Sequence, residues 1–547
     1  MPDDQINNKQ FLEQLGARIA TLDRRLRERD EELHRIYGSL SWRLTHPVRA
    51  SKFLLVKVKA MLSGKLLSAS KRALKNLFIA LLKSERPTLK PKAIAKLNSG
   101  KHCSVNAQDA ESGTLEAQSI ARVRKAAKDE LENRTIFVDI SQLASKDSRA
   151  GTARVVRSMS MALPSLNLGK FQFKAVYAGP GKEYQHVQYF RQMLIEPEVQ
   201  APVSLDEAIS PAFGDIFLGL DWCPYMICNN LDQLLAMRFN GVKIYFVVYD
   251  LLPLLRPEFF PSALNNTFLH WFETITTLAD GLICISQSVA DEVDHWLTRF
   301  PPERDKPLHL GYIHLGADIS GSLPSYGLDR ESYRVLKLVT ERPSFLLVGT
   351  VEPRKGHIQA LGAFEELWEK GFNLNLIIVG QRGWMLSDRL SQLHTHIEFG
   401  DRLTWLEQGS DELLELLYAD STALLMPSEG EGFGLPLIEA AKAQLPIIAR
   451  DLPIFREIAQ EHAFYFKGLQ PCDLADAIEA WLHMHSCGKI PASKNISWLT
   501  WKESSQQLLD TILDNKWYKA ASIQHVQFDS SVNLQATIPD SQLALSA

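Results

Sequence analysis

The chain has 547 residues and a formal net charge of −4, from 60 Lys and Arg residues against 64 Asp and Glu residues. This length allows roughly two to four domains with large hydrophobic cores. A composition of 45% hydrophobic and 23% charged residues argues against an intrinsically disordered, collagen-like or disulfide-framework protein. The six cysteines are scattered without a C-x-x-C pair, which is typical of reduced thiols in a cytoplasmic protein.

The chain has no apolar run of the roughly 18 uncharged residues that a membrane-spanning helix requires. Its first residues are polar and acidic, whereas a secretory signal has a basic start followed by an apolar core. We therefore expect a cytoplasmic chain with neither a spanning helix nor a secretory signal.

Residues 1–46 are predicted to contain a coiled coil. From Leu12 to Ile36 apolar residues recur at steps of three and four, with Arg29 at one seam position, and charged residues fill most of the positions between them. Such a seam favours a homo-oligomer or a partner helix bound through residues 11–37. The alternative is a single amphipathic helix that packs on its own protein.

Residues 47–85 are predicted to form a basic amphipathic helical segment. Residues 33–84 contain eleven Lys and Arg residues and no Asp or Glu, so this stretch carries +11 and the rest of the chain −15. Apolar clusters interleave with the charges, which favours attachment of residues 47–84 to the anionic inner face of the cell membrane. A solvated or internally packed helix is the alternative. We expect no nucleic-acid binding, because the apolar residues of the segment are mainly Leu and Ile and not interleaved exposed aromatic residues.

The rest of the chain has an α/β pattern. Residues 86–133 lack periodicity and are predicted to be a linker, after which β-branched or aromatic runs alternate with helical stretches. The predicted strands are residues 136–140, 171–177, 215–220, 242–249, 281–286 and 308–314, and then 345–349, 374–380, 403–406, 423–428, 447–450 and 463–466. Two such sets indicate two doubly wound domains, over residues 134–325 and 340–515. A disordered tail is expected over residues 519–547.

Strand-to-helix loops are where ligands bind in such domains. The first informative loop follows the predicted strand at 345–349 and precedes a predicted helix at 358–370. It places Arg354 and Lys355 just before the helix N-terminus, where free N–H groups and the helix dipole add to their charge. This combination suits a phosphate or a pyrophosphate. The alternative is a solvated loop with surface charges.

The second informative loop, Ser428-Glu-Gly-Glu-Gly-Phe-Gly-Leu-Pro436, follows the predicted strand at 423–428. Its three glycines allow the backbone to approach a ligand closely, and the proline suits the first turn of a helix. Glu431 lies in the loop and Glu439 inside the following helix. Two carboxylates at different depths of one pocket can accept hydrogen bonds from several sugar hydroxyls.

The segments E-P-R-K-G-H and E-G-F-G-L-P-L-I-E together resemble the donor domain of family four retaining glycosyltransferases. That family has the GT-B fold, in which two Rossmann-like domains face a cleft. The spacing of Glu431 and Glu439 matches its E-x7-E motif. The resemblance implies that Lys355 and Arg354 hold the donor pyrophosphate, that Glu439 binds the nucleotide ribose, and that Glu431 faces the transferred sugar.

The resemblance also implies further donor-binding positions, which are Gly349, Thr350, Gly432, Phe433, Gly434 and Leu435. Many members of the family have an arginine where this chain has Thr350, and we expect Arg354 to replace it. Arg382, after the next predicted strand, is a candidate for contact with the phosphate or the base, with a surface turn as the alternative.

On the acceptor side, residues 138–157 resemble the first strand, glycine loop and helix of the family's acceptor domain, which makes Gly151 a candidate. Residues 248–254 resemble a segment in which many relatives have His-Asp, and this chain has Tyr249 and Asp250 there. A phenol can still hydrogen-bond a sugar hydroxyl. Asp250 is expected to contact donor or acceptor hydroxyls and to act in catalysis, and the alternative is an aspartate that caps a turn.

We predict no metal ion and no other cofactor. His394 and His396 lie near Glu398, but a third and a fourth ligand at suitable spacing are lacking in the sequence. A D-x-D motif that could hold a nucleotide-bound divalent ion is also lacking. The leaving diphosphate would instead be stabilised by cations and helix dipoles.

The predicted reaction is the transfer of a hexose, with retention of configuration, from a nucleotide diphosphate sugar to a hydroxyl. The phrases Y-D-L-L-P-L, R-P-E-F-F-P and H-L-G-A-D resemble bacterial O-antigen and surface-polysaccharide mannosyltransferases. This implies GDP-mannose as donor, a lipid-linked glycan as acceptor and a role in lipopolysaccharide synthesis. The alternatives are a UDP- or dTDP-sugar donor, a coiled-coil assembly scaffold with a degenerate transferase domain, and an epimerase or phosphorylase of the same fold.

Overall fold

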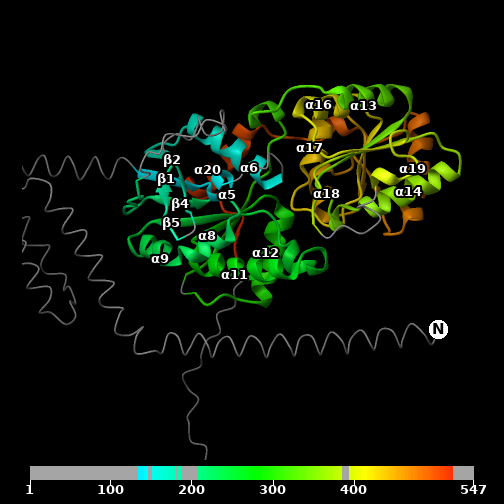
Figure 1. Ribbon diagram of the computed structural model, residues 1–547. Helices are drawn as coiled ribbons and strands as arrows, with labels where there is room; N and C mark the ends of the chain where they lie inside the picture. The colour runs from blue at the N-terminus through cyan, green and yellow to red at the C-terminus, as the bar shows by residue number, and fades with distance from the viewer. Residues whose placement is uncertain are drawn as a thin grey trace, which may run out of the picture. The chain divides into compact units, whose positions relative to one another are not determined.

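The computed structural model describes residues 134–145, 151–179, 181–187, 207–304, 306–384 and 393–521 (Figure 1). The predicted coiled coil at 1–46, basic segment at 47–85 and linker at 86–133 lie outside the described residues, as does the predicted tail from residue 522 onward.

The first domain is built on an eight-stranded sheet with the order β14-β7-β6-β5-β4-β1-β2-β3. The strands are β1 (Arg134–Asp139), β2 (Phe171–Tyr177), β3 (Gln185–His186), β4 (Ile216–Gly219), β5 (Lys243–Val248), β6 (Gly281–Cys284), β7 (His309–Tyr312) and β14 (Lys519–Ala520). The six central strands run parallel, and the edge strands β3 and β14 pair antiparallel. In β1, Ile136 and Val138 enter one core and Phe137 enters another, so the sheet is buried on both faces.

Helices cover both faces of this sheet (Figure 1). Helix α6 supplies Val155, Val156 and Met159 to one core, whereas Trp271 and Leu234 enter the core on the opposite face. The helices of this domain are α5 (Ser141–Ser145), α6 (Gly151–Ala162), α8 (Pro224–Asn229), α9 (Leu231–Phe239), α10 (Leu252–Leu255), α11 (Ser262–Leu278) and α12 (Gln287–Arg299). Its short 3-10 turns are η2 (Leu163–Ser165), η3 (Pro257–Phe259) and η4 (Ile319–Ser322).

The second domain has a six-stranded parallel sheet with the order β10-β9-β8-β11-β12-β13. The strands are β8 (Ser344–Val348), β9 (Asn375–Val379), β10 (Leu403–Leu406), β11 (Ala423–Met426), β12 (Ile447–Arg450) and β13 (Phe464–Phe466). Its helices are α13 (Arg330–Glu341), α14 (His357–Glu369), α16 (Asp411–Asp420), α17 (Leu435–Lys442), α18 (Pro453–Ala459) and α19 (Pro471–Ser486). Its 3-10 turns are η5 (Pro353–Lys355), η6 (Leu393–Thr395) and η7 (Ser493–Asn495).

The predicted fold class is confirmed for the described residues. Two doubly wound Rossmann-like domains face a cavity, which is the GT-B architecture that the resemblance implied. Every predicted strand is present, with ends within two residues of the predicted ones. The two-residue edge strands β3 and β14 were not predicted, because so short a segment carries no measurable alternation.

The domain boundaries differ from those that the sequence predicted. Helix α13 begins at Arg330, before the predicted boundary at residue 340, and packs against α16 of the second domain. Helix α20 (Trp501–Leu513) packs against α6 of the first domain, and β14 joins the first sheet at positions predicted to be tail. An amphipathic helix has the same apolar face whichever domain it packs on, so its sequence pattern does not indicate which domain that face covers.

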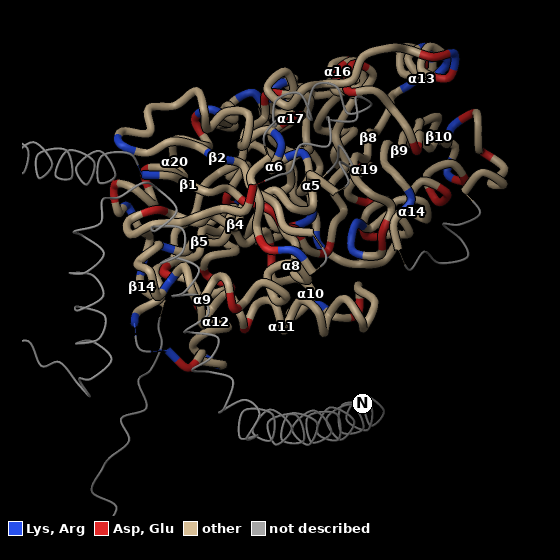
Figure 2. Tube along the Cα trace, turned by 60° about the vertical axis from the view of Figure 1, so that its left-hand side comes forward, with Lys and Arg blue, Asp and Glu red and all other residues tan. Residues whose placement is uncertain are grey.

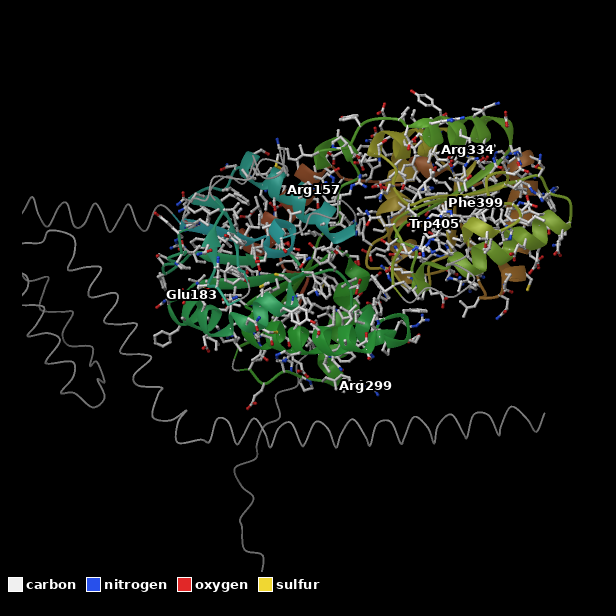
Figure 3. The ribbon with its side chains drawn as sticks, viewed as in Figure 1. Arg157, Glu183, Arg299, Arg334, Phe399 and Trp405 are labelled. Carbon is white, nitrogen blue, oxygen red and sulfur yellow. The ribbon has the colours of Figure 1, made fainter. Side chains whose placement is uncertain are left out.

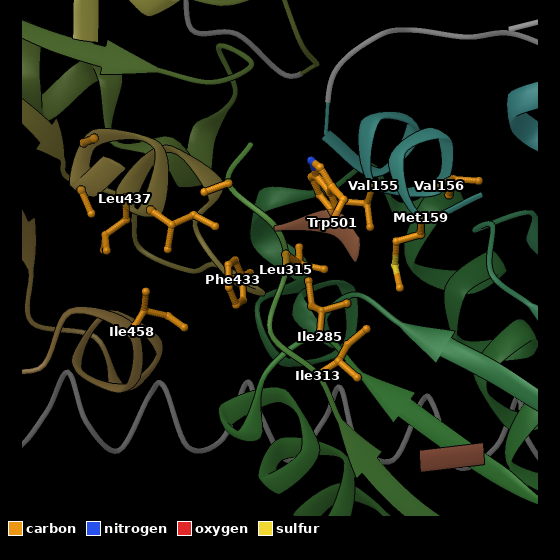
Figure 4. Close-up of a cluster of buried hydrophobic side chains, with 14 of the residues drawn as sticks. Val155, Val156, Met159, Ile285, Ile313, Leu315, Phe433, Leu437, Ile458 and Trp501 are labelled. Carbon is orange, nitrogen blue, oxygen red and sulfur yellow. The ribbon is translucent and has the colours of Figure 1, made fainter. Parts of the chain in front are cut away.

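One hydrophobic cluster contains residues of both domains (Figure 4). Phe433 of the second domain is buried beside Leu315 and Ile285 of the first. The ring centroid of Phe433 lies 5.7 Å from that of His314. The two domains are therefore joined by apolar contact at one side of the cavity.

Acidic and basic residues are interspersed over the described part of the chain (Figure 2). Over the same residues, no helix combines the length and apolar character that crossing a bilayer would need.

Replacing Phe364 by Ala is expected to lower the free energy of unfolding of the second domain by about 3–5 kcal/mol, because a buried aromatic ring is lost from the core. Phe364 is fully buried in α14, and its ring centroid lies 5.5 Å from that of Phe345 in β8. Urea unfolding followed by circular dichroism measures the loss. Ile358 in the same helix is 41% exposed, and Ile358→Ala is the control, with an expected change within about 0.5 kcal/mol. Equal losses for the two variants would contradict this description of the core.

Candidate active site

A cavity of about 660 Å³ lies between the two domains, where the carboxyl ends of both parallel sheets meet. The loops after β8 and β11 line it from the second domain, and the start of α6 and the segment after β5 line it from the first. The predicted site residues that line it are Gly151, Tyr249, Asp250, Gly349, Thr350, Arg354, Lys355, Glu431, Gly432, Phe433, Gly434, Leu435 and Glu439. The structure therefore brings together nearly all of the residues that the sequence selected.

Gly356 allows the loops after β8 and β11 to touch. Its φ is +73°, a conformation that favours glycine, and an added Cβ would lie 2.4 Å from the carbonyl oxygen of Pro427. Any side chain here would strain the backbone and push the second loop away. This glycine thus places Arg354 and Lys355 next to Glu431.

Gly432 has the same role between the domains. A Cβ at this position would lie 2.0 Å from the carbonyl oxygen of Tyr249, in the first domain. The Ser286 hydroxyl, also from the first domain, donates to the Gly432 carbonyl at 2.9 Å. A glycine is therefore needed for the second-domain loop to reach the first domain.

Two ion pairs join the two loops, and a third lies within the loop after β8. The Lys355 ammonium lies 2.6 Å from one oxygen of Glu431, and the Arg354 guanidinium lies 3.1 Å from the other. Arg354 also pairs with Glu352 at 2.7 Å. All four side chains are largely buried, so the charges are compensated within the protein and not by water.

These ion pairs shift the pKa values of their members. Burial by itself would raise the pKa of Glu431, but the charges of Lys355 and Arg354 outweigh it and lower the pKa to about 2. Burial raises the pKa of Glu352 even though Arg354 opposes the shift. Burial opposes ionisation of Arg354 too, but Glu431 and Glu352 raise its pKa above the usual range. Glu431 is therefore ionised at every pH near neutrality.

Glu439 lies deeper, in helix α17, and is held at both oxygens. The Tyr418 hydroxyl donates to one oxygen at 2.7 Å. The Arg154 guanidinium, from α6 of the first domain, lies 2.9 Å from the other. The carboxylate lines the cavity, and each of its oxygens can accept a further hydrogen bond.

The acceptor-side candidates Tyr249 and Asp250 already form hydrogen bonds within the protein. The Tyr249 hydroxyl donates to the carbonyl of Leu220 at 2.7 Å, so its proton is already used. Asp250 accepts from the Leu252 backbone N–H at 3.1 Å, the turn-capping contact that the sequence left open as an alternative. Burial raises the pKa of Asp250, although nearby Arg354 opposes this. Both residues still line the cavity.

Arg382 is not among the described residues that line the cavity. Its guanidinium lies over the Trp405 ring, 5.2 Å from the ring centroid, and 3.7 Å from Glu407, which does line the cavity. His394 pairs with the same Glu407, while His396 pairs with Glu365. In the ranges that the structure describes, no group of three or more His, Cys, Asp or Glu side chains could hold a metal ion.

Three residues of the site were not selected from the sequence. Arg154 and Tyr418 hold Glu439, and Glu352 holds Arg354. Glu352 stands two positions before Arg354, so its pairing could have been proposed from local spacing. Arg154 and Tyr418 are far from Glu439 along the chain, and only the fold brings them to it.

Glu431→Gln is expected to destabilise the protein by about 3–5 kcal/mol near neutral pH, because it leaves the buried Lys355 without the carboxylate that pairs with it and removes one of the two carboxylates that pair with Arg354. Since the folded pKa of Glu431 lies at about 2, below the usual 4.5, its stabilisation is complete above pH 4.5 and is lost as the pH falls toward 2. The difference between wild type and variant should therefore shrink in acid. Urea midpoints at a series of pH values measure it.

The matched control for this experiment is Glu331→Gln. Glu331 forms an exposed ion pair with Arg334, and its loss should cost no more than about 0.5 kcal/mol at any pH. A stability difference for Glu431→Gln that did not change between neutral and acid pH would contradict the depressed pKa.

Comparisons with known proteins point to one family. Residues 329–494 match the family described as glycosyl transferases group 1. The chain is 42% identical over 382 residues to the serotype-specific mannosyltransferase WbdA of Escherichia coli, which covers 69% of this chain and 46% of that protein. It is 36% identical over 121 residues to the O-antigen chain mannosyltransferase RfbU of Salmonella typhimurium, covering 22% of this chain and 33% of that protein. A solved structure of sucrose-phosphate synthase from Thermosynechococcus elongatus aligns with a TM-score of 0.47 at 18% identity, covering 69% of this chain and 95% of that one.

The chain spans less than half the length of its WbdA relatives. The segment that matches the family includes the loops after β8 and β11, and with them Arg354, Lys355, Glu431 and Glu439. Residues 329–494, which contain these four residues, are therefore similar to the glycosyl transferases group 1 family.

Proposed function

We propose that the chain is a retaining glycosyltransferase that moves a sugar from a nucleotide diphosphate sugar to a hydroxyl of a glycan. The observation that carries this proposal is the convergence of Lys355, Arg354, Glu431 and Glu439 in one cavity between two Rossmann-like domains. Cations suit a diphosphate, and carboxylates suit the hydroxyls of a ribose and a sugar. This pairing is what a nucleotide sugar requires.

Lys355 and Arg354 are proposed to bind the donor diphosphate and to stabilise the charge that develops on it as it leaves. Both already bind Glu431, so the phosphates must share these cations with the carboxylate. An ammonium has three donors and a guanidinium five, which allows such sharing. Helices α14 and α17 have Gly356 and Gly434 as their N-cap residues and no side-chain cap, so N–H groups of their first turns are left for the phosphates, except at Pro436, which has no N–H.

Glu439 is proposed to accept hydrogen bonds from the donor ribose, and Glu431 to face the transferred sugar. Asp250 and Tyr249 lie on the first-domain side of the cavity, where the acceptor would enter beside Gly151. In the proposed front-face reaction, the bond from the anomeric carbon to the leaving phosphate breaks as the acceptor oxygen bonds to that carbon. The acceptor proton moves to a phosphate oxygen, so the proposed reaction uses neither a covalent nucleophile nor a metal ion.

Mannose is the proposed sugar, GDP-mannose the donor, and a lipid-linked glycan of O-antigen synthesis the acceptor. The names of WbdA and RfbU support this choice, since both are mannosyltransferases and one acts on an O-antigen chain. A UDP- or dTDP-sugar remains the alternative donor and is an outcome of the test below.

Lys355→Ala and Glu431→Ala are each expected to lower sugar transfer by about 10²-fold or more, because they remove groups that bind the developing charge and the sugar. Transfer is measured with the full chain, a membrane lipid extract and radiolabelled GDP-mannose, UDP-sugars and dTDP-sugars. Lys370→Ala is the control: Lys370 ends the same helix α14, pairs with Glu479 on the surface and should leave transfer unchanged. Undiminished transfer in both site variants would refute the site, and transfer from another nucleotide sugar in place of GDP-mannose would refute the donor.

We also propose that residues 47–84 attach the chain to an anionic membrane surface, and that residues 11–37 pair with a second copy or a partner helix. The support for both comes from the sequence: eleven positive charges without a negative one over residues 33–84, and an a/d seam before them. Attachment would bring the cavity to the membrane on which a lipid-linked acceptor is held.

Removal of residues 1–90 is expected to abolish co-sedimentation with vesicles rich in anionic lipid, because it removes the basic segment, while transfer to a soluble acceptor persists. Removal of residues 1–46 alone is the control, and it should leave vesicle binding intact while lowering the oligomeric state measured by light scattering. Binding of the full chain should also weaken with salt. A chain without residues 1–90 that still sediments with the vesicles would refute the attachment.

A further inference from the structure

Arg154 reaches from the first domain into the donor side of the cavity. It lies in the second turn of α6, and its Nη1 is 2.9 Å from Oε1 of Glu439 in α17 of the second domain. The two side chains are 10% and 4% exposed, and both line the cavity. Arg154 is thus a first-domain group bound directly to the carboxylate proposed to hold the donor ribose.

Arg154 and Tyr418 together determine how the Glu439 carboxylate is oriented. The Tyr418 hydroxyl bonds Oε2 at 2.7 Å, and the guanidinium occupies one direction at Oε1. Since each carboxylate oxygen accepts more than one hydrogen bond, a ribose hydroxyl can be added without displacing either partner. Tyr418 belongs to the same domain as Glu439, so of these two partners Arg154 alone depends on how the two domains meet.

Burying this ion pair carries a free-energy cost. Among the described residues, the Nε–H of Arg154 is buried without a hydrogen-bond partner, and such a group costs free energy. Burial opposes the charge of Arg154, but Glu439 together with the nearby Asp411 and Glu415 outweighs burial and raises the pKa of the guanidinium. A buried ion pair of this kind often contributes no more to stability than apolar residues of the same size would. A function in binding explains it better.

We propose that Arg154 is a positioning residue for the donor: it orients Glu439 for the ribose hydroxyls when the two domains are closed on each other. This inference rests on the proposed function, since it needs a nucleotide whose ribose binds Glu439. Arg154 acts through Glu439 and does not touch the reacting atoms. Its loss should therefore weaken binding of a ribonucleotide and raise the KM for the donor more than it lowers kcat.

The ribose itself supplies the test. If Arg154 acts through Glu439 on the ribose hydroxyls, a nucleotide without those hydroxyls should not respond to its removal. The loss of Arg154 and the loss of the hydroxyls should then be non-additive, as for two groups in one interaction. If Arg154 had only a structural role, its loss would weaken the binding of both nucleotides equally.

Isothermal titration calorimetry on the full chain compares GDP with 2′,3′-dideoxy-GDP. Arg154→Met should weaken the binding of GDP by roughly tenfold or more, a factor that corresponds to about 1.4 kcal/mol of binding free energy. It should leave the affinity for dideoxy-GDP unchanged. Arg154→Lys keeps the charge and should recover part of the preference for GDP, which also guards against a folding defect in the first variant. Arg157→Met is the matched control: Arg157 is buried one turn later in α6 (Figure 3) and donates to the Ser322 carbonyl, so its loss should not change the preference.

The outcomes separate the two proposals. If wild type prefers GDP over dideoxy-GDP and Arg154→Met keeps the same preference, the role of Arg154 is refuted and the proposed function stands. A preference that falls equally in Arg157→Met would also refute it, because the effect would then be structural. If wild type binds UDP in place of GDP, the comparison is made with UDP and its 2′,3′-dideoxy analogue. If it binds dTDP, whose sugar has only the 3′-hydroxyl, the comparison is made with the 3′-deoxy analogue of dTDP. If wild type binds none of the three, the proposed function fails and the inference fails with it.

Discussion

Buried charge is the constraint on which the site depends. Glu431, Lys355, Arg354 and Glu352 form a network of two carboxylates and two cations whose side chains are largely buried, so removing any one of the four leaves the charges of the other three unbalanced. The loop after β8 and the loop after β11 are fixed to each other by these contacts. Because the pairs lie at the carboxyl ends of adjacent strands, the sheet itself brings the two loops together. The cavity therefore has its charged groups in place before a ligand arrives.

Polar contacts between the domains accompany the apolar ones near the cavity. Arg154 meets Glu439, the Ser286 hydroxyl donates to the Gly432 carbonyl, and Glu457 of α18 accepts the Ser288 N–H at the start of α12. Apolar contact is concentrated at Phe433. Polar interfaces of this kind are typical of domains that move relative to each other. A motion that separated the domains would break the Arg154–Glu439 pair and so would change the donor side of the cavity itself.

The sheets could be predicted because their signal is local. A parallel strand that is buried on both faces is a short continuous apolar run, and such runs stand out between helical stretches. The loop residues Lys355 and Glu431 could be predicted for the same reason, since each follows a strand end directly. Helix α20 could not be assigned to a domain, because its buried residues Trp501 and Leu508 are equally apolar wherever the helix packs.

The fold class, the strands and the two loops could be predicted from the amino-acid sequence, because each depends on residues that are neighbours along the chain. Three contacts follow from the tertiary fold alone: Arg154 and Tyr418 hold Glu439, the Tyr249 hydroxyl donates to the Leu220 carbonyl, and the Arg382 guanidinium lies over the Trp405 ring without lining the cavity. Each of these is a contact between groups that are distant in sequence or between side-chain conformations that packing selects. Local sequence patterns do not predict such contacts, because the chain contains many possible partners of the same chemistry. The folded geometry brings only one of them within reach.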